Sequence, residues 1–154
     1  MDKAKLQVEA FKALVVHRAF VAYECNDGDA YITFDGYSAF LVPAEDVCID
    51  IAKMRHMPSL KNLFVLGDGY TEAKLTKRCT MFDANGGILR EYRAVDDAAK
   101  HVWVRESMMK RYNSEKCTAY IRDELGAVKF VNQATGKVDH IILPVRVCNG
   151  GNDD

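Results

Sequence analysis

The chain has 154 residues, of which 49% are hydrophobic and 28% are charged, and this composition favours one globular domain over a disordered chain. A formal net charge of −1 gives no electrostatic signature of a nucleic-acid binder, and no apolar run reaches the roughly 18 residues of a membrane span. We see no secretory signal at the start, and the five cysteines form no C-x-x-C pair. We therefore expect a cytoplasmic protein with reduced thiols and no membrane partner.

The first part of the chain predicts a strand, a helix and then three strands. Polar and apolar residues alternate over 5–8, as in a strand, and a helical pattern begins at Glu9. The apolar face of this helix is expected to carry Phe11, Leu14 and Val15, which are spaced i, i+3 and i+4. Three strand-like runs separated by glycine-containing turns follow, at 20–25, 31–34 and 38–42.

The middle of the chain, from 45 to 99, predicts shorter elements. A helix is expected over 46–57, where it ends before Pro58, and a short apolar strand over 63–66. Two strands over 72–82 and 88–95 are expected to form a hairpin around an Asn-Gly-Gly turn. No linker rich in proline, serine or glycine separates this stretch from its flanks. We therefore interpret it as an insertion within one domain that covers 1–154.

The last part of the chain repeats the predicted order of the first. A strand, a helix and three more strands are expected at 101–104, 105–112, 117–122, 127–131 and 140–147. Matching residues occupy corresponding places in the two parts, as in Val8 and Val104, Ala22 and Ala119, and Pro43 and Pro144. An internal repeat constrains topology strongly. We predict an α+β fold of two strand–helix–three-strand pseudo-repeats, about 3–45 and 99–148, with the 45–99 insertion between them.

Two short stretches carry a likeness to a known family. Residues 141–147 read IILPVRV, an apolar strand that runs into a proline and an arginine, and residues 32–37 read ITFDGY. They resemble the DNA polymerase sliding clamp, the bacterial beta-subunit family, which ends in Met-Pro-Met-Arg-Leu and carries a Thr-Asp-Gly-Tyr/His-Arg stretch. Leu143 and Val145 replace the methionines here, and Ser38 replaces the arginine. Because each clamp domain contains the strand–helix–three-strand unit twice, the resemblance implies one sliding-clamp-like domain.

The resemblance also implies a DNA-facing surface on the two helices, since clamp helices face the phosphates of duplex DNA. Such contacts are electrostatic and do not read the bases. The candidate DNA-binding residues are Lys12 and His17 opposite the apolar face of the first helix, Lys110 on the exposed side of the second, and Arg111 nearer the edge of that side. The alternative is that these residues belong to ordinary solvated faces, because Glu106 lies among them.

A second implied site is a pocket for a short peptide motif. The residues that match the positions of the clamp's peptide-docking pocket are Tyr37, Leu143, Pro144 and Val145. Apolar and aromatic side chains at such positions bind a linear motif by accepting its side chains into pockets. The alternative is plain core and strand-end packing.

No catalytic or metal-binding motif emerges from the sequence. The four histidines show no metal-ligand spacing with one another or with the cysteines, and no serine or cysteine nucleophile has an identifiable base. We expect no cofactor and no enzymatic activity. A weaker alternative is an enzyme with an unrecognised cleft around Asp68 and Glu72.

Beside this weaker enzymatic alternative, two non-enzymatic functions remain open. The leading hypothesis is a non-enzymatic clamp-like protein of DNA metabolism that binds duplex DNA or a polymerase-associated protein, as a replication processivity factor does. The rival is a protein-interaction module that has the clamp-like fold and does not bind DNA. Encirclement of DNA would require self-association, because clamp rings contain six such domains and this chain supplies one.

Overall fold

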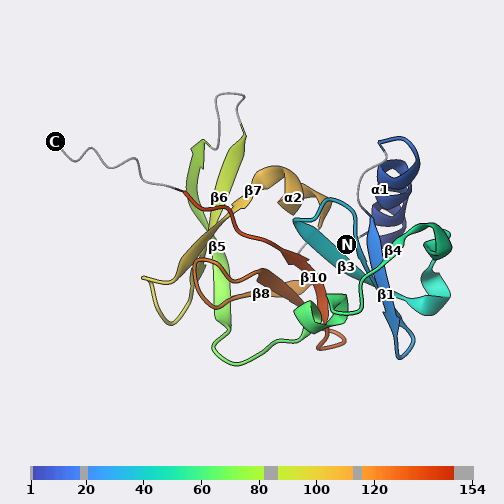
Figure 1. Cartoon of the computed structure of the whole chain (residues 1–154). Coiled ribbons are helices and arrows are strands. Elements are labelled where there is room, and N and C mark those ends of the chain that lie inside the picture. The colour runs from blue at the N-terminus through green and yellow to red at the C-terminus, as the bar shows by residue number, and fades with distance from the viewer. Residues whose placement is uncertain (1, 18–20, 82–86, 113–115, 148–154) are drawn as a thin grey trace.

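The computed structural model describes residues 2–17, 21–81, 87–112 and 116–147, and within them the chain is mixed α+β. Two α-helices accompany a ten-stranded sheet (Figure 1). The helices are α1 (Lys3–Val15) and α2 (Glu106–Arg111). The strands are β1 (Ala22–Asn26), β2 (Asp29–Thr33), β3 (Ser38–Pro43), β4 (Arg55–His56), β5 (Thr71–Met81), β6 (Ile88–Ala94), β7 (His101–Arg105), β8 (Cys117–Ile121), β9 (Val128–Asn132) and β10 (Val138–Ile142).

Two antiparallel three-stranded units, β1–β2–β3 and β8–β9–β10, meet in the middle of the sheet, and β4, β5, β6 and β7 extend it on either side. The strand order is β4-β1-β2-β3-β10-β9-β8-β5-β6-β7, so β3 and β10 are the central neighbours. Their antiparallel register pairs Ser38 with Ile142 and Phe40 with His140. This pairing joins the first and last parts of the chain, because β1–β3 precede residue 44 and β8–β10 follow residue 116.

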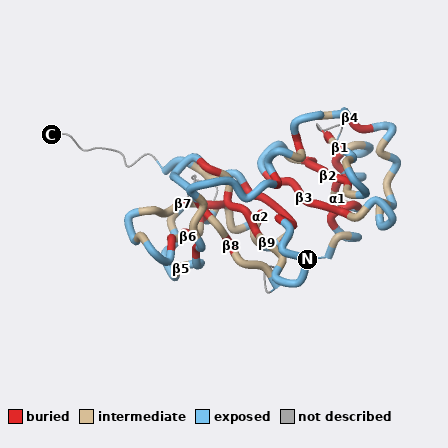
Figure 2. Tube along the Cα trace, turned by 90° about the horizontal axis from the view of Figure 1, so that it is seen from below, coloured by how far each residue is buried: buried red, intermediate tan, exposed pale blue. Residues whose placement is uncertain are grey.

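The two faces of the sheet bury different clusters. Both α-helices pack on one face, since Leu6 and Ala10 of α1 lie in the same buried cluster as Met108 of α2. The opposite face buries a smaller cluster under the 3₁₀ helix η3 (Leu60–Phe64). In Figure 2 the buried positions run along the central strands and the inner sides of the helices. No helix in the described ranges is long and apolar enough to cross a membrane.

The expected strand over 5–8 is wrong, because these residues belong to α1. The carboxylate of Asp2 caps the helix by accepting a 2.9 Å hydrogen bond from the backbone N–H of Lys5. The expected apolar face is wrong at Phe11 and Val15, which are about half exposed, at 49% and 51%, whereas Leu14 packs partly buried against the core. The buried positions of α1 are Leu6, Gln7, Ala10 and Ala13. A four-residue alternation was too short to distinguish strand from helix.

The two parts of the chain therefore share less than the predicted repeat. The expected order in the last part is confirmed, with β7, α2, β8, β9 and β10 in sequence. The first part has the helix and three strands but no strand before the helix within the described residues. The final strand also ends earlier than expected, at Ile142, because Pro144 lacks the N–H that a central strand must donate.

The inserted region is an integral part of the sheet. The predicted hairpin is confirmed as β5 and β6, which lie between β8 and β7, while the expected turn at 83–87 falls largely outside the described residues. The expected strand over 63–66 is wrong, since Leu63 and Phe64 belong to η3 and Val65 is its C-cap. The expected helix over 46–57 is replaced by two short 3₁₀ helices and a short strand, namely η1 (Ala44–Asp46), η2 (Ile51–Lys53) and β4.

Candidate functional site

An apolar pocket lies at the end of the central strand pair. Tyr37 immediately precedes β3 and Leu143 immediately follows β10, so the β3–β10 register brings them together. The backbone N–H of Leu143 donates a 2.7 Å hydrogen bond to the carbonyl of Tyr37 and extends this pairing by one step. Two of the residues expected at a peptide site are thereby neighbours in space.

The Tyr37–Leu143 pocket encloses about 230 Å³ on the face of the sheet that carries η3. Its floor includes Leu60 and Ile141, which belong to the buried cluster of that face. Its rim is unusually apolar for a surface, because Tyr37, Leu63 and Leu143 are 54%, 41% and 36% exposed. The full lining is Thr33, Gly36, Tyr37, Ser38, Ala39, Met57, Leu60, Leu63, Ile141 and Leu143.

The turn that presents Tyr37 is held by hydrogen bonds. The Asp35 carboxylate accepts from the backbone N–H groups of Tyr37 and Ser38, at 2.9 and 2.7 Å. Gly36 supplies the positive φ of 72° that the turn requires. The guanidinium of Arg111 donates a 2.6 Å hydrogen bond to the other oxygen of Asp35, which ties the turn to α2. The rim of the pocket is therefore fixed before any ligand arrives.

The other two residues of the expected peptide site do not line this pocket. Val145 donates its backbone N–H to the carbonyl of Trp103 in β7, at 2.7 Å. Its side chain lines a second, more polar cleft together with Arg78 and Trp103. Pro144 lies between the two regions in the chain. The expected group of four thus spans two surfaces, and only Tyr37 and Leu143 share one.

The four candidate DNA-binding residues lie in different environments. Lys12 and His17 are exposed at the C-terminal end of α1 and just beyond it. Lys110 forms an exposed ion pair with Glu106 at 3.0 Å. Arg111 is the least available, because it pairs with Asp35 and with Glu9 of α1, at 2.6 and 3.5 Å.

The exposed side of α1 is apolar as well as basic. Val8, Phe11 and Val15 are each about half exposed, and their spacing of i, i+3 and i+7 puts them on one side of the helix. Lys5 and Lys12 flank them. A surface that binds phosphates by charge has no need of such a row, so this side of α1 lends the DNA hypothesis little support.

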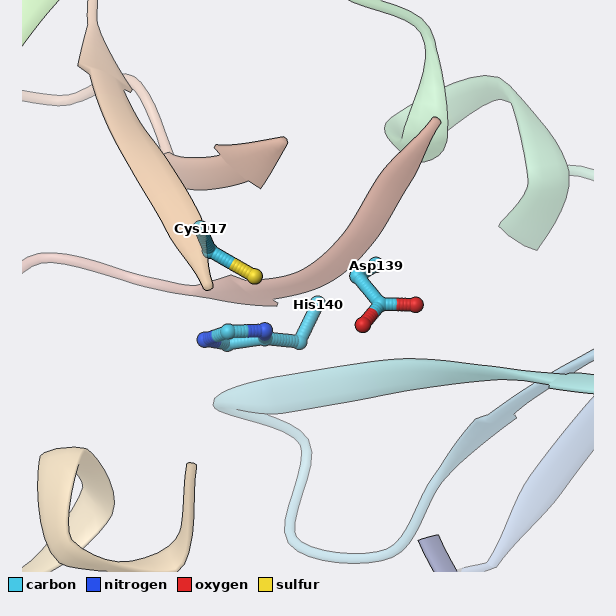
Figure 3. Close-up of side chains that lie close together, drawn as sticks. All are labelled: Cys117, Asp139 and His140. Atoms are coloured by element: carbon cyan, nitrogen blue, oxygen red, sulfur yellow. The ribbon is translucent and has the colours of Figure 1, made fainter. Parts of the chain in front are cut away.

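A polar cluster of two buried residues and one partly buried cysteine lies on the helix-bearing face of the sheet. Cys117 of β8 and Asp139 and His140 of β10 bring a sulfur, a carboxylate oxygen and a ring nitrogen within 4.8 Å of one another (Figure 3). A β-bulge explains the arrangement, because the register shifts between Val138 and His140. Val138 consequently packs on the opposite face, while His140 stacks under the helices.

His140 is completely buried and both of its ring nitrogens lack a hydrogen-bond partner. Its ring is stacked between those of Tyr112 and Phe130, with centroids 4.4 and 4.1 Å away. Burial, more than the nearby charge of Lys3, lowers the pKa of His140 to about 3. The imidazole is therefore neutral at ordinary pH and keeps one nitrogen lone pair available.

The composition of this cluster is that of a cysteine-nucleophile site, but its electrostatics are not. Burial, together with the nearby Asp139 carboxylate, raises the pKa of the Cys117 thiol. An activated cysteine needs the opposite shift, and a general base needs a pKa near the working pH. His140 and Cys117 would thus remain a neutral imidazole and a neutral thiol, which gives no support to acyl transfer.

Sequence reasoning missed this cluster because its members are far apart in the chain. The one local signal is the adjacent pair Asp139-His140 within an otherwise apolar strand. Two consecutive polar residues break the alternation of a strand, and such a break can indicate a β-bulge. Asp68 and Glu72, the carboxylates of the alternative enzymatic cleft, are both exposed.

Comparison with known proteins finds no matching family model, no similar curated protein and no similar solved structure.

Proposed function

We propose that this protein is a protein-interaction module that captures a short linear motif of a partner in the Tyr37–Leu143 pocket. The single observation that carries the proposal is the convergence of three exposed apolar side chains, Tyr37, Leu63 and Leu143, around an apolar hollow. Exposed apolar surface of this kind is a common mark of interaction sites. The resemblance to sliding clamps supports the same reading, because it assigns Tyr37 and Leu143 to a peptide-docking position in a clamp-like domain.

The size of the pocket favours a peptide side chain over a cofactor. Pockets for drug-sized ligands and cofactors typically enclose about 300–1,000 Å³. A hollow of about 230 Å³ suits one or two bulky apolar side chains of an extended segment. Its lining has few groups that could orient a polar small molecule, since Thr33 and Ser38 are both largely buried.

The fixed rim supports useful affinity despite the small area. Binding to a mobile rim would cost ordering entropy at each immobilised side chain, about 0.5–1.5 kcal/mol apiece. Here the Asp35 carboxylate and Arg111 already hold the turn that carries Tyr37. We expect a few anchor contacts in the pocket to dominate the binding free energy, as in other hot spots.

Selection from a displayed library of random peptides tests the proposal. We expect the wild-type protein to enrich peptides with a bulky apolar anchor, and Leu63→Asp to weaken their binding by at least about 30-fold, or about 2 kcal/mol. Val95→Asp is the matched control, because Val95 is an exposed apolar residue that does not line the pocket. Peptides that bind Leu63→Asp as tightly as wild type would place the site elsewhere.

Duplex DNA binding is the second candidate, favoured by the exposed lysines Lys12 and Lys110 on the two helices. It predicts an affinity that falls steeply with salt and that weakens for all DNA sequences when both lysines are replaced by glutamate. We expect no such binding at physiological salt. Salt-dependent binding that the double variant removes would restore the processivity-factor hypothesis.

A further inference from the structure

We propose that Cys117, Asp139 and His140 form a binding site for a divalent transition-metal ion of the zinc class. The three residues offer one sulfur, one oxygen and one nitrogen atom within 4.8 Å of one another. This mixed set matches the ligands that zinc accepts in proteins, and three protein ligands leave a fourth position for water or another ligand. The site is independent of the Tyr37–Leu143 pocket, which lies on the other face of the sheet.

The burial of His140 is the observation that points to a ligand. A buried polar group without a hydrogen bond destabilises the fold, so an imidazole with two unpartnered nitrogens is an unfavourable feature of a core unless it binds a ligand. Phenylalanine in its place would stack equally well between Tyr112 and Phe130. Coordination of a metal by one ring nitrogen would offset part of this destabilisation and would explain why a histidine occupies this buried position.

The three ligand atoms would have to move only a short distance toward one another to bind a metal ion. Tetrahedral ligands about 2.0–2.3 Å from zinc lie roughly 3.5 Å from one another. Rotation about the side-chain bonds of Cys117 and Asp139 could close the gap from 4.8 Å, whereas the ring of His140 is held in place by its two stacking partners.

Surrounding groups suit this role. Lys3 of α1 pairs with one oxygen of Asp139 at 3.0 Å, and Asn132 approaches the other at 3.4 Å, so the carboxylate is oriented from outside as metal ligands usually are. Cys117 is only partly buried and lines an open cleft with Glu72 and Phe130, which provides a path for an ion. The Cys117 thiol must lose its proton to solvent as the sulfur–metal bond forms, so binding should weaken as the pH falls.

Cobalt(II) is a suitable probe, because a cysteine thiolate bound to it gives a ligand-to-metal charge-transfer absorption. We expect the metal-free, reduced full chain to bind one equivalent of Co²⁺ with this absorption, and Zn²⁺ to displace it. Cys117→Ser should abolish the absorption. His140→Phe, which keeps the aromatic stack, should weaken binding by more than about 100-fold, beyond the usual cost of losing an outer partner.

Cys48→Ser is the matched control, since Cys48 is an exposed thiol outside the cluster. Its Co²⁺ spectrum and affinity should equal those of the wild type. The proposal is overturned if the wild type shows no charge-transfer band and no heat of Zn²⁺ binding, or if Cys117→Ser and His140→Phe bind as the wild type does. Lys3→Met is a milder variant in case His140→Phe fails to fold, because Lys3 forms an ion pair with Asp139. It should weaken metal binding by about tenfold or more, and an unchanged affinity would remove Asp139 from the site.

Discussion

One buried carboxylate, that of Glu91, is expected to make the folded protein sensitive to acid. Glu91 of β6 is fully buried, and it accepts hydrogen bonds from Thr76 and Arg93 at 2.7 and 2.9 Å. Burial alone would raise the pKa of Glu91, but the hydrogen bonds from Arg93 and Thr76 outweigh it and hold the pKa below its usual value. The ionised carboxylate therefore stabilises the folded chain at neutral pH.

Replacement of Glu91 by glutamine tests this contribution. Because the folded pKa is the lower one, the stabilisation is complete above the unfolded pKa of about 4.3 and is lost as the pH falls through the folded pKa. We expect Glu91→Gln to lower the free energy of unfolding by about 1–3 kcal/mol at pH 7, with the difference shrinking below about pH 4. Urea denaturation across this range measures it, and Glu45→Gln, at an exposed position, should change little. A deficit independent of pH would contradict this account.

At the scale of the element, the register of α1 decides which residues are core. Leu6 is 1% exposed whereas Phe11 is 49% exposed, although a sequence pattern that starts the helix at Glu9 favours Phe11 as core. Leu6→Ala should therefore lower the free energy of unfolding by about 2–5 kcal/mol, because it opens a cavity. Phe11→Ala should cost less than about 1 kcal/mol. Chemical denaturation compares the two, and a larger cost for Phe11→Ala would mean that α1 packs by its other side.

The elements predicted from sequence were correct where local residue patterns define them, and wrong where tertiary packing determines the structure. The hairpin of β5 and β6 and the run from β7 to β10 carry clear alternation and turn residues, so they were predictable. The start of α1 was not, since the Asp2 cap and the small buried Ala10 give no strong pattern. Tyr37 and Leu143 were named from a family likeness, while Leu63 joins their pocket only through the tertiary placement of η3.

At the scale of the whole molecule, both edges of the sheet are protected. One edge is β4, which has only two residues, and the other is β7, whose Trp103 carbonyl already accepts the N–H of Val145. Short or covered edges discourage pairing between molecules. We therefore expect a monomer in light scattering over a concentration series, with and without duplex DNA. A species of about six chains would instead support a ring and favour the hypothesis that the protein encircles DNA.

The Tyr37–Leu143 pocket is expected to accept an apolar anchor of a partner peptide. Methyl-labelled protein titrated with a selected peptide in an NMR experiment tests this most directly, because leucine and isoleucine methyl groups line the pocket. The largest chemical-shift changes are expected at Leu60, Leu63, Ile141 and Leu143, and the signals of Leu89, which is buried on β6, should not change. Shifts centred on α1, or on the cleft beside Trp103, with the pocket methyl groups unchanged, would contradict it.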